Sequence, residues 1–157
     1  MRFFPAFVLI LISTSTVVVR AQDSPLKYCL IDKVIAAGGY DVVSYFVAGK
    51  ADAGDPKISA RFDEVTYYFS SDEHRKMFEK QPAKYVPQFG GWCSMTLAMG
   101  KATKPSYDNF LIRDGKLYLF ERTLSVNGRE LWLRDPDGNA RRAAMTYRKY
   151  AVGELRK

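Results

Sequence analysis

The stretch FLIRDGKLYLF, residues 110–120, is the feature that most constrains the fold of this chain. Its centre is the dipeptide Asp114-Gly115, a preferred two-residue turn between antiparallel strands. Apolar residues recur at every second position on both sides of the turn, as they do in strands with one buried face; they are Phe110, Ile112, Leu117 and Leu119. The sequence therefore predicts a β-hairpin here, and with it a fold that contains antiparallel sheet.

A second hairpin and a helix are predicted upstream. In RFDEVTYYFSS, residues 61–71, apolar residues alternate around an acidic turn at Asp63 and Glu64. Ser70 and Glu73 follow with the spacing of a capping box, so a helix is predicted from near Ser71 to just before residue 82.

The remaining elements are short. Residues 42–47 are predicted as a short strand or a packed turn, and residues 92–100 as a short helix ended by Gly100. Residues 123–150 are predicted to be mainly helical, with a break at the Pro-Asp-Gly turn of residues 136–138. Because strands and helices do not alternate as parallel units, the sequence predicts an α+β fold: a small single domain with short antiparallel hairpins packed against several short helices.

The first 21 residues have the features of a secretory signal peptide. Arg2 precedes an apolar run over residues 3–12, and Val19 and Ala21 occupy the positions that cleavage requires. An uncleaved anchor is the alternative, but the run is shorter than the ~20 residues that span a bilayer. We therefore expect a secreted, extracellular protein with a signal peptide (1–21), an N-terminal extension (22–34), one domain (35–150) and a basic C-terminal tail (151–157).

Positive charge is concentrated toward the C-terminus. The segment 122–157 contains nine basic and four acidic residues. A patch on a predicted helix would attract an anionic polymer or a membrane surface, and a merely solvated helical face is the alternative. The patch residues are Arg141, Arg142, Arg148 and Lys149. Nucleic acid is not expected as a partner of a secreted chain that has no recognisable nucleic-acid-binding motif.

The two cysteines, Cys29 and Cys93, are an even number in a chain expected to enter an oxidising compartment. A disulfide between them is the default prediction, and in the chain-entropy model a loop of that length stabilises a fold by ~4 kcal/mol. This prediction competes with a role for Cys93 as a metal ligand or nucleophile.

Five segments, in this order and spacing, resemble the YHS domain in its secreted and periplasmic form. They cover most of the chain from about residue 35 to residue 147, and they are GYDVVSYFVAGK (39–50), YYFSSDEHRKMF (67–78), QPAKYVPQFGGWC (81–93), DGKLYLF (114–120) and Trp132. The resemblance implies an α+β fold and a role in binding a metal ion, with copper as the candidate.

The chain departs from related domains of copper-pumping ATPases, which carry cysteines in DPVCGM and YYFCSxxC motifs. On this sequence those positions fall on Ser44, Ser70 and His74. A neutral hydroxyl is a poor ligand for copper(I) or zinc, so a thiolate-rich site is excluded. The candidate metal ligands that remain are His74, the single histidine of the chain, and Cys93. Thioethers near the motif are those of Met77, Met95 and Met99.

Each of these candidates also has a structural interpretation. His74 would then be a hydrogen-bonded residue at the edge of the core, and the methionines would fill gaps in it. Four further residues would either pack with their polar groups satisfied internally or line a small-ligand pocket. They are Tyr40, Asp41, Tyr67 and Tyr85.

Enzymatic activity is not favoured by the sequence. Cys93 and His74 would supply a nucleophile and a base, but no accompanying catalytic motif is present, and a disulfide would remove the thiol. Two functions stay open: a metal-binding domain, and a secreted interaction or small-ligand-binding domain without metal.

Overall fold

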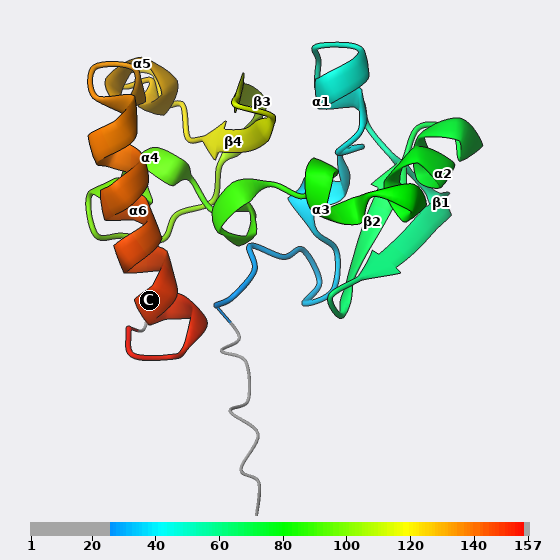
Figure 1. Cartoon of the computed structure of the whole chain (residues 1–157), viewed down its shortest axis with the longest axis horizontal. Coiled ribbons are helices and arrows are strands. Elements are labelled where there is room, and N and C mark those ends of the chain that lie inside the picture. The colour runs from blue at the N-terminus through cyan, green and yellow to red at the C-terminus, as the bar shows by residue number, and fades with distance from the viewer. Residues whose placement is uncertain (1–25, 156–157) are drawn as a thin grey trace, which may run out of the picture.

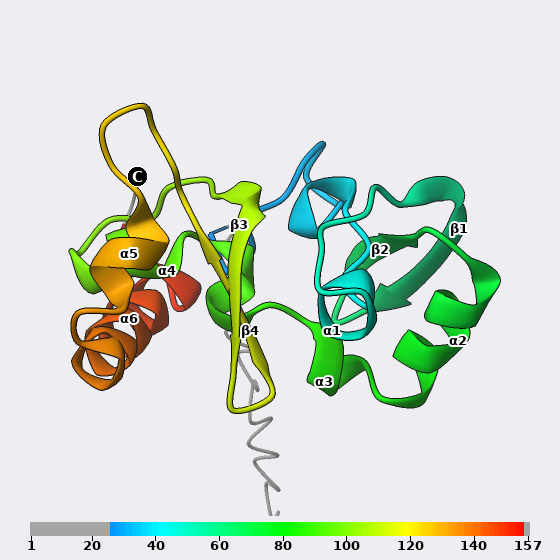
Figure 2. The same ribbon diagram turned by 90° about the horizontal axis from the view of Figure 1, so that it is seen from above.

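The computed structural model describes residues 26–155 as two packed regions with a β-hairpin between them (Figure 1, Figure 2). The α2 region contains α1, β1, β2, α2 and α3, and the α6 region contains α4, α5 and α6; the β3–β4 hairpin lies between them in both views. The elements are η1 (Ala37–Gly39), α1 (Ser44–Val47), β1 (Asp55–Phe62), β2 (Val65–Phe69), α2 (Asp72–Lys80), α3 (Pro82–Tyr85), η2 (Gln88–Gly91), α4 (Ser94–Ala98), β3 (Ser106–Arg113), β4 (Lys116–Phe120), α5 (Gly128–Trp132) and α6 (Pro136–Ala151). The predicted α+β class, with antiparallel hairpins against short helices, is confirmed.

Both predicted hairpins are present as two-stranded antiparallel sheets. In the first, Phe62 faces Val65 across a turn in which Asp63 and Glu64 have φ of 49° and 69°. In the second, the turn residue Asp114 has φ of 52°. These left-handed angles belong to the two-residue turns whose twist matches that of the flanking strands.

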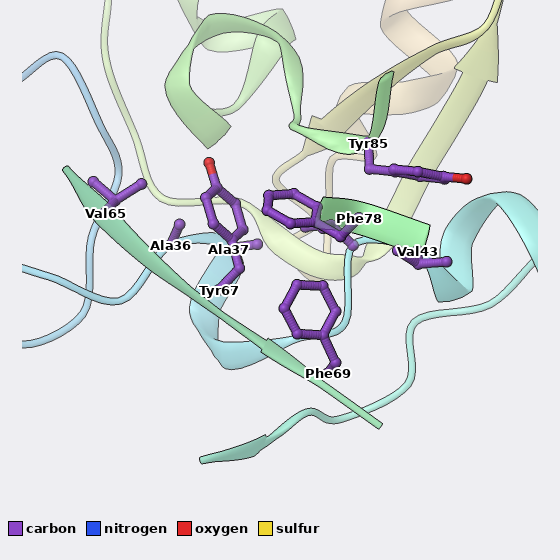
Figure 3. Packing of buried hydrophobic residues seen from close by; sticks show 9 residues of the cluster. Ala36, Ala37, Val43, Val65, Tyr67, Phe69, Phe78 and Tyr85 are labelled. Atoms are coloured by element: carbon purple, nitrogen blue, oxygen red, sulfur yellow. The ribbon is translucent and has the colours of Figure 1, made fainter. Parts of the chain in front are cut away.

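Helix α2 begins where the sequence predicts, but its cap is Ser71 rather than Ser70. The Ser71 Oγ accepts a hydrogen bond from the backbone N–H of His74, at 3.2 Å. Phe78, on the inner face of α2, packs against Tyr67 and Phe69 of β2 with ring centroids 4.9 and 5.1 Å apart (Figure 3). This aromatic contact joins helix and hairpin into the core of the α2 region.

Two predicted elements differ from the structure. Of the two alternatives predicted for residues 42–47, the strand is wrong, because residues 44–47 form a single helical turn, α1, with Ser44 and Tyr45 buried. The Pro-Asp-Gly segment begins α6 instead of interrupting a helix, because Pro136 occupies the first helical turn and the Asp135 side chain accepts a hydrogen bond from the Gly138 N–H at 3.0 Å. The break between α5 and α6 therefore lies at residues 133–135.

The described part of the predicted N-terminal extension is integral to the fold. The Trp92 indole N–H donates to the carbonyl of Leu26 at 2.9 Å, and the Tyr147 hydroxyl of α6 donates to the carbonyl of Lys27 at 3.0 Å. The predicted signal peptide, 1–21, lies outside the described residues. Within residues 26–155, no helix is both long and apolar enough to cross a membrane.

Candidate functional site

The candidate site is a pair of side chains, His74 and Asp41, from two different elements of the α2 region. His74 lies in the first turn of α2, and Asp41 lies between η1 and α1. The His74 Nδ1 is 2.6 Å from the Asp41 Oδ2. The Asp41 side chain is fully buried, whereas the His74 side chain is 18% exposed, so the pair leads from the interior to the surface.

The Asp41 carboxylate is held by three further donors. Its Oδ1 accepts from the Val43 backbone N–H at 2.9 Å. Its Oδ2 accepts from the Ser70 backbone N–H at 2.9 Å and from the Ser70 hydroxyl at 2.7 Å. A buried carboxylate is tolerated when its oxygens are bonded in this way. Asp41 is therefore a fixed acceptor, and it sets the orientation of the imidazole beside it.

The arrangement leaves one ring nitrogen of His74 for chemistry. The Nδ1 atom is engaged by Asp41, and among residues 26–155 no hydrogen bond engages Nε2. When Nδ1 carries the proton that it shares with Asp41, a neutral imidazole has its lone pair on Nε2. That lone pair is what a metal ion, or the proton of a ligand, would use.

Ser44, Ser70 and His74, the three positions that the resemblance aligns with metal ligands, each contact Asp41. The buried Ser44 hydroxyl lies 2.7 Å from the carbonyl oxygen of Asp41 and 2.9 Å from that of Lys50, and it accepts from the Asp52 N–H at 3.1 Å. Both hydroxyls are thus used in internal hydrogen bonds.

The site does not have the geometry of a serine nucleophile. Ser70 Oγ lies 3.3 Å from His74 Nδ1, on the side of the ring that already faces Asp41. In a catalytic triad the serine lies at the opposite nitrogen from the carboxylate. Ser70 therefore supports Asp41 and is not activated by His74.

Cys93 is placed far from His74. It caps α4, where its fully buried Sγ accepts from the backbone N–H of Glu121 at 3.1 Å and from that of Thr96 at 3.5 Å. Helices α2 and α4 lie in different regions in both views, so the structure does not bring the two predicted ligands together.

Of the methionines, Met95 lies in α4 and Met99 directly follows it, and Met77 packs against the core of the α2 region. Within the described part of the chain, no group of three or more His, Cys, Asp or Glu side chains is arranged to hold a metal ion.

The predicted disulfide between Cys29 and Cys93 is not formed in the structure. Both residues are buried, and they do not lie at disulfide distance. The physical reason is that each is held in its own place: Cys93 caps α4, and the Cys29 backbone N–H donates to the carbonyl of Gly90, in η2, at 2.9 Å. Burial, and after it the neighbouring Cys29, raises the pKa of Tyr107 above its ordinary value.

The four predicted pocket residues have different surroundings in the structure. Tyr40 stacks on Tyr107 with ring centroids 5.4 Å apart, and Tyr85 is buried with its ring edge-to-face against Phe46. Asp41 is committed to His74, and Tyr67 packs in the core (Figure 3). The sequence does not predict the Asp41–His74 pair, because the two residues are 33 positions apart and no local pattern relates them.

The predicted basic patch lies on α6. Arg141, Arg142, Arg148 and Lys149 are all exposed, and Arg142 is partly committed to Asp135, at 3.2 Å. Members of this patch line two shallow hollows of about 490 and 440 Å³, both of which also include Met145.

Comparison with known proteins gives no relative: no family model, no curated protein and no solved structure matches this chain. Fold and site together define a small α+β domain with one carboxylate-oriented histidine at its surface.

Proposed function

We propose that this chain is a YHS-like binding domain in which His74 offers its Nε2 atom as a single imidazole ligand to a metal ion, copper first. The observation that supports the proposal is the 2.6 Å contact between His74 Nδ1 and the buried Asp41 carboxylate. Histidines that bind metals almost always donate their other ring N–H to a carboxylate, carbonyl or water, which fixes the ring and raises the basicity of the ligating nitrogen. Copper(II) binds a given nitrogen ligand more tightly than the other divalent first-row metals do.

The residues fit an attachment point for copper and do not fit a closed, multi-ligand centre. The hydroxyls of Ser44 and Ser70 are engaged elsewhere, and Cys93 lies in the other region. The remaining coordination positions would be filled by water or by the carrier that delivers the ion. We therefore expect an affinity below that of thiolate-rich copper sites, and exchange of the ion with other carriers.

The test uses copper(II) titration of the metal-free, reduced protein without a histidine tag. Because His74 is the single histidine of the chain, imidazole coupling in the electron paramagnetic resonance spectrum of bound copper(II) reports on one residue. We expect the coupling in the wild-type protein and its loss in His74→Ala. Asp41→Asn is expected to weaken binding about 10–100-fold, as changes to such supporting carboxylates do.

Cys93→Ala is the matched control, because Cys93 is the other predicted ligand but lies in the other region. It is expected to bind copper as the wild type does. Unchanged imidazole coupling in His74→Ala, or no coupling in the wild-type protein, would overturn the proposal.

A second candidate function is binding of an anionic polymer through α6. The supporting observation is that four basic side chains stay exposed within residues 141–149 of one helix, a length of about 12 Å at 1.5 Å per residue. Guanidinium groups suit sulfate and carboxylate groups because they donate two parallel hydrogen bonds.

Retention on immobilised heparin tests this second function. Retention above physiological salt is expected, and it should be lost when Arg141 and Arg148 are both replaced by Gln. Elution of the wild-type protein at or below physiological salt would leave only a solvated helical face.

A further inference from the structure

A small hollow of about 180 Å³ opens where the α2 region, the α6 region and the N-terminal stretch, residues 26–36, meet. Five of its ten lining residues are aromatic, and one is a carboxylate. The side chains that matter here are Tyr28, Phe62, Asp63, Tyr67, Phe89 and Tyr147. They come from the N-terminal stretch, the β1–β2 hairpin, η2 and α6.

The aromatic walls converge on a common space. Phe89 and Tyr147 pack with ring centroids 5.9 Å apart. Burial raises the pKa of Tyr67 above its ordinary value, and Tyr28, Asp63 and Tyr147 add to the rise. Tyr67 lines the same hollow as Tyr28, Asp63 and Tyr147, although those three residues belong to three separate segments of the chain.

The chain already places a cation at the edge of this hollow. The Lys27 Nζ lies 3.1 Å from the Asp63 Oδ2 and 5.2 Å from the centroid of the Tyr28 ring. The Tyr28 hydroxyl donates a hydrogen bond to the same carboxylate oxygen. A carboxylate and an aromatic face are the groups by which proteins recognise organic cations, and here the Lys27 ammonium lies against both.

We infer that the hollow binds a small organic cation, an alkylated ammonium group such as that of choline, which displaces the Lys27 ammonium from Asp63. Ring faces attract a quaternary ammonium without needing hydrogen bonds to it, and Asp63 supplies the opposite charge. The volume is below the roughly 300–1,000 Å³ of pockets for drug-sized ligands, so the site suits a headgroup. This inference is independent of the copper proposal, since none of its residues belongs to the His74 site.

The hairpin turns provide a matched pair of variants. Asp63 has φ of 49° in the β1–β2 turn, and Asp114 has φ of 52° in the β3–β4 turn. Asparagine tolerates the left-handed region well, so Asp63→Asn removes the carboxylate charge while keeping the turn. Asp114→Asn makes the same chemical change in the other hairpin, at a residue that does not line the hollow.

The experiment is titration with choline in the presence of a chelator, followed by tyrosine resonances in NMR spectra, with the neutral isostere 3,3-dimethylbutan-1-ol as the comparison ligand. The wild-type protein should bind choline at least about tenfold more tightly than the isostere, and Asp63→Asn should lose about tenfold in choline affinity. Asp114→Asn should bind as the wild type does, and Lys27→Met should bind choline more tightly because the internal competitor is gone. Equal affinity for choline and its isostere, unchanged binding in Asp63→Asn, or no binding by either the wild-type or the Lys27→Met protein would overturn the inference.

Discussion

The two regions of the molecule each contain a fully buried hydrogen-bond acceptor, Asp41 or Cys93, that backbone N–H groups hold in place. The hydrogen-bond networks around the two acceptors differ in the residues they lead to. In the α2 region, Asp41 accepts from Val43 and Ser70 and then contacts His74, whose side chain is 18% exposed. In the α6 region, the Cys93 sulfur accepts from Thr96 and Glu121.

The hydrogen bonds around Cys93 form a closed ring. Thr103 bonds both Thr96 and the Glu121 carboxylate, at 2.9 and 2.8 Å, which closes the set of contacts around the sulfur. Burial and hydrogen bonding alone therefore do not mark a functional site. What distinguishes the Asp41 network is that it ends in an imidazole whose Nε2 has no hydrogen bond among residues 26–155.

The largest expected effect is that of Asp41→Ala. The substitution leaves two backbone N–H groups, a hydroxyl and an imidazole without their common acceptor. Breaking a buried, hydrogen-bonded charge by removing one partner typically lowers the free energy of unfolding by about 3–5 kcal/mol. Urea unfolding measures the change.

Asp52→Ala is the control, because its partner Lys50 is exposed and such pairs contribute about 0–1 kcal/mol. Equal losses in the two variants would mean that Asp41 is not the centre of the network.

A smaller loss is expected for Cys93→Ala, in the closed network of the α6 region. Two backbone N–H groups lose a weak sulfur acceptor in a buried place, which costs about 1–3 kcal/mol. Thermal and urea unfolding give the magnitude. If Cys93→Ala were as stable as the wild-type protein but bound copper more weakly, the comparison between the two regions would be wrong. Copper binding would then depend on the Cys93 network in the α6 region.

The smallest effect concerns Asp63, a carboxylate that has partners but is not buried. Its pKa lies below the ordinary value of 3.8, first because the Tyr28 hydroxyl donates to it and then because of Lys27. A lowered folded-state pKa contributes stability that is present above pH 3.8 and is lost as the pH falls through the folded-state value.

Because the Asp63 side chain is 46% exposed, solvent screens the effect, and we expect less than about 1 kcal/mol. The difference in unfolding free energy between the wild-type protein and Asp63→Asn should shrink as the pH is lowered from 5 toward 2. A difference that grows on acidification would show that the contacts of Asp63 do not favour its charged form.

The sequence predicts the parts of this fold whose signals are local. The turns at Asp63 and Asp114 and the start of α2 depend on residues within a few positions of each other, and all are found. The Pro-Asp-Gly segment shows the limit of such reasoning, because Pro136 is equally at home in a turn and in the first turn of a helix. The Asp135 side chain, which caps the helix by accepting from the Gly138 N–H, distinguishes the two.

The candidate site is less accessible to local patterns. His74 is identified by its motif, but its partner Asp41 is fixed by the packing of the segment before α1 against the end of β2. The separation of Cys93 from His74 has the same cause, since sequence spacing does not say which of two regions a short helix joins. An even number of cysteines likewise predicts pairing without saying whether the fold brings the two thiols together.

The hydrogen bond from the Tyr147 hydroxyl to the carbonyl of Lys27 joins residues 120 positions apart. During synthesis, the α2 region can form its hairpin and helix from contiguous chain, but this contact has to wait until residue 147 has left the ribosome. Contacts between such distant residues carry a large loop-closure cost and slow folding. The N-terminal stretch, although made first, should therefore be among the last segments to become protected from hydrogen exchange, and chains cut short before residue 147 should leave it open to proteases.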